Sequence, residues 1–334
     1  MAVPANVASS IATTSGNLIA VGAGNREDLE NAIYNISPTQ TPFMSSIGRG
    51  TVKARKHEWQ IDTLAAQDLS NKNIEGDDAT TDAPTNTSRI NNLTVISDKV
   101  ARVSGSQEVV DKAGKNSEMA YQLAKKSAEL KLDMEGIMSG ISQYIVGSDS
   151  VAQSCAGYET WISDVQSSRG ATGADTAGLS SSAPQTVFQP NASAGPTDGT
   201  QRAFVESDFK TVLAALFTSG GDPTMCIVSA ANKQRASGFA GYATRFDKSE
   251  DKSITAAIDY YVSDFGTVRF VPSRFTRARS ALVVDPTYWA VGYLRSFRQW
   301  DLAKTGDSDR KQLLSEWTIV AKNPTSSGIV ADLT

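Results

Sequence analysis

The chain of 334 residues is long enough for one large domain or two ordinary ones. Hydrophobic residues make up 40% of it and charged residues 20%, which is typical of a globular protein and excludes an intrinsically disordered one. The 36 acidic residues outnumber the 32 lysines and arginines, giving a formal net charge of −4. This balance excludes a protein that wraps nucleic acid with its whole surface.

The two cysteines, Cys155 and Cys226, are far apart in the sequence, which excludes a disulfide framework and a zinc ribbon and suits a reducing cytoplasm. No lysine or arginine precedes Arg26, so the basic region of a signal peptide is missing. The apolar stretch 281–294 is too short and too interrupted to span a bilayer. We therefore expect a soluble cytoplasmic product.

Residues 1–25 are small and polar and leave two interpretations open. They form either a frayed terminus or an arm that becomes ordered only on a neighbouring subunit. Arg26–Tyr34 is predicted to be a short helix capped by Asn25. The prolines at positions 38 and 42 then favour an extended, turning path, because each disfavours helix at the residue before it.

The alternating pattern of Val52–Thr63 predicts a strand, and Leu93–Ser104 predicts a second one. About thirty polar residues separate them, and loops of that length are usually functional or mobile. The root of this hairpin is basic and its distal part is acidic, which suits docking onto an adjacent copy of the chain. An equally good interpretation is that these residues form a loop in solvent that contacts no other subunit. The candidate subunit-interface residues are Lys53, Arg55, Lys56, His57, Trp59, Glu75, Asp77, Asp78 and Asp82.

The clearest predicted element is a helix capped by Asn116 and running to about Ile145. Its apolar residues form one stripe, and Lys125–Glu129 and Lys131–Glu135 are expected to form pairs one turn apart. A helix of roughly 30 residues would span about 45 Å and cross an entire domain.

Residues 163–203, rich in Ser, Gly, Ala, Thr and Pro, are predicted to be a flexible loop outside the core. The rest of the chain mixes helices with short strands, so the fold class is α+β. The expected helices are 206–216 and 231–239, and the expected strands are 225–228, 260–263, 267–271, 281–284, 289–293 and 317–320.

No group of residues supplies a nucleophile, a base and an oxyanion donor together, so we expect no enzyme, no cofactor and no metal site. The single histidine, His57, would have to serve any Ser–His–Asp arrangement, yet it lies among lysines and arginines. The runs Arg274–Arg279 and Arg295–Trp300 mix basic and aromatic residues and could stack nucleic acid. The acidic total favours contacts between subunits for both runs, or arginines whose stems pack on apolar surface.

The chain resembles major capsid proteins of tailed bacteriophages with the Hong Kong 97-type fold. The resemblance spans roughly residues 27–334 and is weakest at 163–203. Segments that carry it are Ala32–Phe43, Arg55–Gln60, Ile74–Ala79, Ser97–Ser104, Asn232–Arg235, Ala243–Lys248, Tyr261–Thr267, Asp285–Val291, Asp301–Asp307 and Gly328–Thr334.

The resemblance implies five parts. They are an N-terminal arm (1–49), an extended hairpin loop (50–104), a peripheral domain with a long spine helix (105–204), an axial domain (205–300) and a C-terminal return to the peripheral domain (301–334).

It also implies a subunit that assembles as hexamers and pentamers into an icosahedral virion head, in the cytoplasm of the bacterial host. The implied partners are other copies of the chain, a portal protein, scaffold or decoration proteins and packaged double-stranded DNA, with no membrane. The first alternative function is the shell of an encapsulin-like nanocompartment. The second is a hydrolase with His57 as its base.

Overall fold

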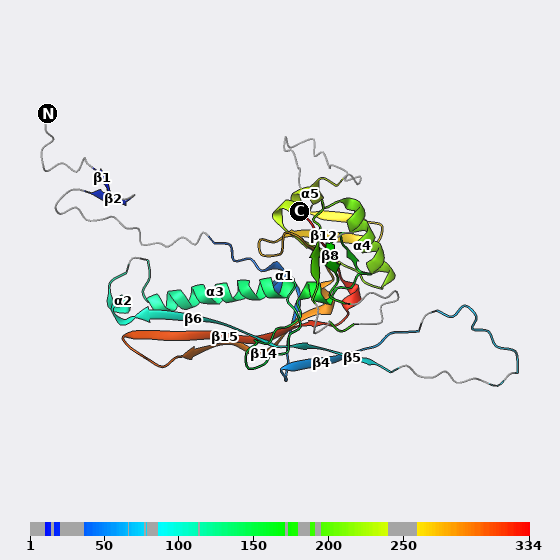
Figure 1. The fold of residues 1–334 in the computed structure, drawn as a ribbon, viewed down its shortest axis with the longest axis horizontal. Helices are drawn as coiled ribbons and strands as arrows, with labels where there is room; N and C mark the ends of the chain where they lie inside the picture. The colour runs from blue at the N-terminus through cyan, green and yellow to red at the C-terminus, as the bar shows by residue number, and fades with distance from the viewer. Residues whose placement is uncertain are drawn as a thin grey trace, which may run out of the picture.

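The computed structural model describes residues 11–14, 17–20, 37–65, 67–76, 78, 86–112, 114–170, 173–179, 188–190, 195–239 and 259–334. It combines an elongated layer, in which helix α3 lies along a four-stranded sheet, with a compact lobe that carries α4 and α5 (Figure 1). The loop between β4 and β5 extends far beyond one end of this body (Figure 1).

The sheet of the elongated layer has the order β3-β14-β15-β6. Its strands are β3 (Gly48–Thr51), β14 (Trp289–Asp301), β15 (Ser308–Ala321) and β6 (Val95–Ser104). β14 and β15 form an antiparallel ribbon that is much longer than the two short strands predicted for them. Hydrophobicity revealed only the buried halves of these strands, because the distal half of β14 is exposed and that of β15 is polar or charged at most positions and only partly buried.

Helix α3 (Glu118–Ser139) confirms the predicted spine helix but is shorter, about 33 Å at 1.5 Å per residue. Its cap is Ser117, whose hydroxyl accepts the Ala120 N–H, in place of the predicted Asn116. It ends at Gly140, and the segment after it does not continue to Ile145. The Glu159 N–H donates to the Gly140 carbonyl, and the Gly157 N–H donates to the carbonyl of Ser142, so these carbonyls are not free to continue a helix.

The predicted hairpin pairing was partly wrong. β4 (Lys56–Ile61) pairs with β5 (Ser88–Leu93), in antiparallel register from Lys56↔Leu93 to Ile61↔Ser88. The predicted second strand, Leu93–Ser104, is β6, which pairs with β15 and belongs to the sheet under α3. The chain therefore changes sheets at Thr94, and only residues 56–93 form the hairpin.

The compact lobe is built on a six-stranded sheet of order β11-β12-β10-β13-β16-β7. These strands are β11 (Tyr260–Ser263), β12 (Gly266–Pro272), β10 (Met225–Val228), β13 (Ala281–Val284), β16 (Gly328–Val330) and β7 (Ser167–Ser168). Helices α4 (Glu206–Thr218) and α5 (Ala230–Ser237) match their predicted positions within two residues.

The predicted domain boundaries at 204 and 300 do not coincide with the division between the sheets. β14 precedes residue 301 but lies in the elongated layer, whereas β16 follows it and lies in the compact lobe. β7, which precedes residue 205, also pairs into the lobe. The chain thus crosses between the two layers several times. The predicted boundaries missed these crossings because the sequence alone does not show which distant strands pair.

The remaining elements are short. They are β1 (Ile11–Thr14), β2 (Asn17–Ala20), α1 (Pro42–Ser46), α2 (Gly105–Val109), β8 (Gly173–Thr176), β9 (Thr197–Gly199) and the 3-10 turns Tyr158–Trp161, Pro286–Tyr288 and Pro324–Ser326. The helix predicted at Arg26–Tyr34 lies outside the described residues.

The expectation that residues 163–203 stay outside the core was wrong for the start of this stretch. Ser163 and Gln166 are buried, and the Gln166 carbonyl accepts the Ile329 N–H beside β16. The Gln166 side-chain amide donates to the Ser219 hydroxyl at 3.1 Å. Polar residues are tolerated in this core because their hydrogen bonds are satisfied there.

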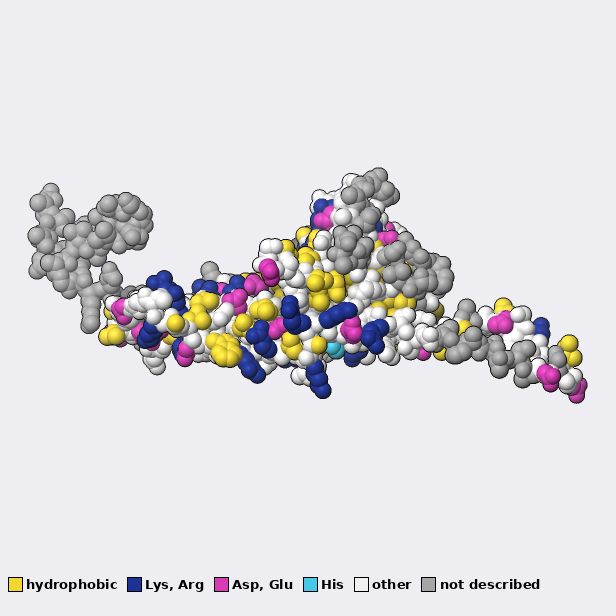
Figure 2. Space-filling model, turned by 60° about the horizontal axis from the view of Figure 1, so that its bottom comes forward, with side chains coloured by type: hydrophobic (Ala, Val, Ile, Leu, Met, Phe, Trp, Pro, Cys, Tyr) yellow, Lys and Arg dark blue, Asp and Glu magenta, His cyan; other side chains and the backbone are white. Residues whose placement is uncertain are grey.

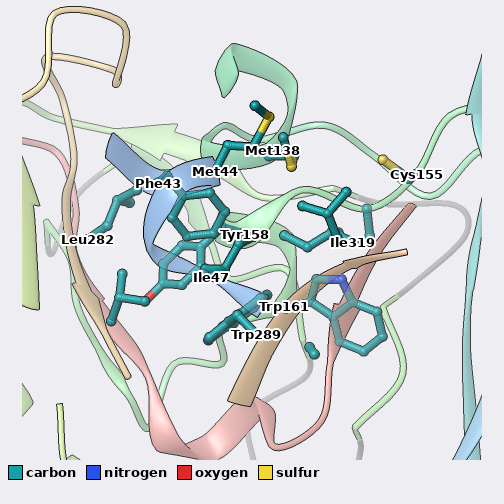
Figure 3. Packing of buried hydrophobic residues seen from close by; sticks show 14 of the residues in the cluster. Phe43, Met44, Ile47, Met138, Cys155, Tyr158, Trp161, Leu282, Trp289 and Ile319 are labelled. Atoms are coloured by element: carbon teal, nitrogen blue, oxygen red, sulfur yellow. The ribbon is translucent and has the colours of Figure 1, made fainter. Parts of the chain in front are cut away.

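One aromatic cluster joins the two layers (Figure 3). The rings of Phe43 and Tyr158 meet edge to face at 5.5 Å, and Tyr158 lies 4.7 Å from Trp289. The Tyr158 hydroxyl donates to the carbonyls of Val283 and Gly328, both in the lobe sheet. Because Phe43 belongs to α1, this cluster also fixes the end of the N-terminal segment to the body.

Candidate subunit interface

The root of the hairpin divides into side chains that face solvent and side chains that face its own subunit. Lys53, Arg55 and Lys56 are exposed. Lys56 pairs with Glu58 at 2.7 Å, and Arg55 donates to the side chain of Gln153 at 2.7 Å. These exposed cations are available to a second molecule, at the small cost of breaking surface contacts.

Trp59 and His57 lie on the inner face of β4, as the alternation predicts. The Trp59 indole N–H donates to the Ala321 carbonyl at 3.0 Å, and its ring lies 5.6 Å from that of Trp161. His57 is half-buried against Trp59, and burial lowers the pKa of its imidazole. Both residues therefore attach the hairpin to its own subunit.

Asn92 completes the attachment, and no sequence signal pointed to it. It is fully buried, and its amide donates to the carbonyls of Ile319 at 2.8 Å and Ala156 at 3.2 Å. Its side-chain oxygen accepts the N–H groups of Leu93 and Ala156. With all four bonds made, Asn92 ties β5 to β15 and to the segment after α3.

The distal part of the hairpin is exposed. Glu75 and Asp78 lie in solvent, whereas Asp77 and Asp82 lie outside the described residues. Three large apolar side chains share this loop, with exposed fractions of 99% for Leu64, 80% for Leu69 and 78% for Ile74. Apolar side chains so fully exposed on one loop are typical of a surface that is buried on association.

The arginines at the end of the first basic-aromatic run form ion pairs within their own subunit. Arg277 pairs with the buried carboxylate of Glu159 at 2.9 Å and with Asp198 at 2.6 Å. Arg279 pairs with buried Asp332 at 3.4 Å. The second run, Arg295–Trp300, forms the distal part of β14 and is mostly exposed.

Neither a histidine-based triad nor a metal-binding cluster is found among the described residues. Among them no hydrogen bond joins the His57 ring to a serine, a cysteine or a carboxylate, and no three His, Cys, Asp or Glu residues are placed to hold a metal ion. An open groove of about 610 Å³ beside α3 is lined by Asp98, Asp133 and Arg277, all engaged in contacts within the subunit. No helix in the described part of the chain is long and apolar enough to cross a membrane.

Both thiols are buried in the core. Burial raises the pKa of Cys155 to about 12 and raises that of Cys226 further. Neither thiol is therefore a nucleophile at neutral pH, because the thiolate is the reactive form.

Comparison with known proteins assigns the chain to a protein family. A family model described as SU10 major capsid protein matches residues 9–334. The chain belongs to this family. The curated major capsid protein of Escherichia phage Phieco32 is 24% identical to this capsid protein over 342 residues, covering 92% of this chain and 94% of that one.

Solved structures agree on the fold. The capsid asymmetric unit of cyanophage A-1(L) has a TM-score of 0.62 at 12% identity, covering 93% of this chain and 97% of that one. The encapsulin of Synechococcus elongatus PCC 7942 has a TM-score of 0.52 at 9% identity, covering 92% of both chains. The α+β, Hong Kong 97-type fold is confirmed, and so is the function of a tailed-phage major capsid protein that builds an icosahedral shell. The family is one of structural proteins, and the encapsulin likeness concerns the fold alone.

Proposed function

We propose that this capsid protein assembles as hexamers and pentamers, in which the β4–β5 hairpin of each subunit lies over the next subunit. The head closes around double-stranded DNA in the host cytoplasm, with a portal protein and with scaffold or decoration proteins as further partners. Residues 1–49 serve as the N-terminal arm, the elongated layer as the peripheral domain and the compact lobe as the axial domain.

The observation that carries this proposal is the exposure of Leu64, Leu69 and Ile74 on a loop that extends away from its own body (Figure 1). An isolated two-stranded hairpin is marginally stable in water, and this loop has no core of its own. Its root, by contrast, is fixed by Trp59 and Asn92. A rigid root with an uncovered apolar tip is suited to reach a second molecule. Lys53, Arg55, Lys56, Glu75, Asp77, Asp78 and Asp82 remain the proposed interface residues.

Replacing residues 64–85 with a short Gly-Ser linker is expected to abolish shell formation while leaving a folded subunit. The replacement stops before β5, because Ile90 and Asn92 are buried and their loss would damage the core. Circular dichroism and thermal unfolding check the fold, and negative-stain electron microscopy checks for shells.

A second variant tests whether contacts or chain length matter. Here the same residues are replaced by a Gly-Ser segment of equal length, which keeps the reach of the loop but removes its apolar and acidic side chains. It is also expected to form no shells. Closed shells from either variant would show that the loop does not hold neighbouring subunits together.

A further inference from the structure

The hairpin has a further attachment, on the edge of β5 that faces away from β4. The Asn91 N–H donates to the side-chain oxygen of Gln189 at 2.7 Å, and the Gln189 side-chain nitrogen donates to the Asn91 carbonyl at 3.0 Å. In an antiparallel pair of strands, every second residue turns both backbone groups outward, and the two bonds to Gln189 show that Asn91 is one of these. The amide of Gln189 therefore takes the place that a peptide group of a third strand would occupy.

Gln189 is held in place by the residues on either side of it. Phe188 packs against the aromatic cluster that joins the two layers, and Pro190 is buried. Because a proline favours an extended backbone at the residue before it, Gln189 is kept extended beside β5. These three residues belong to the stretch 163–203, which the sequence predicts to be a flexible loop. A second part of this stretch thus returns to the body and contacts the hairpin.

The contact with Gln189 marks how far along β5 the hairpin edge is held. Nearer to the body, the Leu93 N–H donates to the side-chain oxygen of Asn92. At Asn91 itself, the buried Tyr144 donates its hydroxyl proton to the side-chain oxygen at 2.7 Å. Arg89 is the next outward position toward the loop and is exposed. Asn91 is therefore the last outward position at which the structure shows this edge bound to the body.

Gln189 restrains the hairpin in a different direction from Trp59 and Asn92. Those two side chains donate to carbonyls of β15 and hold the inner face of the hairpin against the body. Gln189 instead acts in the plane of the hairpin, because it continues the hydrogen-bond ladder of β4 and β5. The first contacts oppose lifting of the hairpin from the body, and the contact with Gln189 opposes a sideways swing.

A sideways swing has a large effect because the loop is long. The loop projects from the body as a thin extension in both views (Figures 1 and 2). About 13 residues separate the end of β4 from the middle of the loop, so its tip lies up to about 40 Å away. A rotation of about 10° at the root would move the tip by roughly 7 Å, beyond the about 4.5 Å within which apolar side chains make contact.

We propose that Gln189 is a positioning residue for assembly, whose side-chain amide sets the direction in which the hairpin leaves the body. This inference rests on the proposed function and adds to it the residue that directs the loop toward the adjacent subunit. A hairpin without this restraint still reaches its neighbours, but at varying angles. Contacts between identical subunits close into a defined assembly only when their angle is fixed, so varying angles favour open or irregular shells.

Replacement of Gln189 tests its role in assembly. Gln189→Met removes both hydrogen bonds at nearly constant shape, and it is expected to give a folded subunit whose shells are open or of mixed diameter in negative-stain electron microscopy. Gln189→Glu keeps an acceptor for the Asn91 N–H but has no donor for the carbonyl, so its effect is expected to be intermediate. The matched control is Gln143→Met, at an exposed position beside Gly195, and it is expected to form uniform shells.

The direction of the hairpin is measured in the unassembled subunit. Spin labels at Thr63→Cys and Lys131→Cys, both exposed positions, report the distance between the end of the hairpin root and α3. This distance distribution is expected to broaden in Gln189→Met and to stay unchanged in Gln143→Met. Hydrogen exchange at the Asn91 amide is expected to become about tenfold faster in Gln189→Met. Cys155 and Cys226 are buried and give little background labelling.

Three results would overturn the inference. Uniform shells and an unchanged distance distribution in Gln189→Met would do so, and the proposed function would stand as long as loop replacement blocks assembly. Aggregation of Gln189→Met with an unchanged distribution would assign Gln189 to protecting the β5 edge from a third strand. Shells formed without the loop would remove both proposals together. If Gln189→Met does not fold, Gln189→Glu carries the same measurements.

Discussion

Arg277→Met is expected to lower the free energy of unfolding by about 3–5 kcal/mol, because it leaves the buried Glu159 carboxylate without its partner. Glu159 is 2% exposed, and its contact with the Arg277 guanidinium is 2.9 Å. Burial raises the pKa of Glu159, and the charge of Arg277 opposes that rise. Arg277 also holds Asp198, so its loss loosens the segment leading into α4. Chemical denaturation of the unassembled subunit measures the change.

The matched control is Arg274→Met, in the same basic run but at an exposed position, and it is expected to change stability little. The pH dependence has a definite sign. With Arg277 gone, the pKa of Glu159 in the folded subunit rises further above its unfolded value. The folded state then binds a proton that the unfolded state releases, so the stability of Arg277→Met falls as pH rises through this interval. Equal losses in Arg274→Met and Arg277→Met, at every pH, would contradict the assigned ion pair.

Glu135→Ala is expected to cost roughly 2–5 kcal/mol, because it removes the acceptor for two buried backbone N–H groups. One carboxylate oxygen accepts the Phe43 N–H and the other accepts the Met44 N–H, each at 2.7 Å. These groups form the start of α1, where Pro42 supplies no donor. The carboxylate therefore binds the end of the N-terminal segment to the spine helix. Thermal unfolding measures the contribution of this contact to stability.

Burial raises the pKa of Glu135, and the hydrogen bonds from Met44 and Phe43 oppose that rise. Stability contributed by Glu135 is therefore greatest at low pH and falls as pH rises above the ordinary range of a glutamate. Glu135→Gln should remove that dependence while keeping one acceptor. The control is Glu129→Gln, which removes a partly exposed carboxylate of α3 that pairs with Lys126 and does not contact α1. An unchanged melting temperature for Glu135→Ala would contradict a stabilising contact between Glu135 and α1.

The spine helix shows what the sequence could and could not predict. Its apolar stripe was sufficient to place α3, and the pair Lys131–Glu135 looked like an ordinary surface contact. Glu135 instead turns inward to α1, a contact 92 residues away in sequence that no local pattern encodes. Lys126 rather than Lys125 pairs with Glu129, at 2.7 Å.

In the hairpin, too, the sequence predicted some features and could not predict others. Charge segregation identified its basic root and acidic tip, and alternation placed Trp59 on one face of β4. Sequence alone could not show that this face lies against the subunit's own Trp161, nor that Asn92 is buried. The long ribbon of β14 and β15 was missed because its distal half is exposed on β14 and only partly buried on β15, so hydrophobicity does not mark it.

Cryo-electron microscopy of assembled shells, at a resolution that traces the backbone, tests the central claim most directly. The account predicts closed icosahedral shells in which the β4–β5 loop of each subunit lies on the adjacent subunit, which covers Leu64, Leu69 and Ile74. Shells in which this loop folds back on its own subunit, or projects into solvent without touching a neighbour, would contradict it.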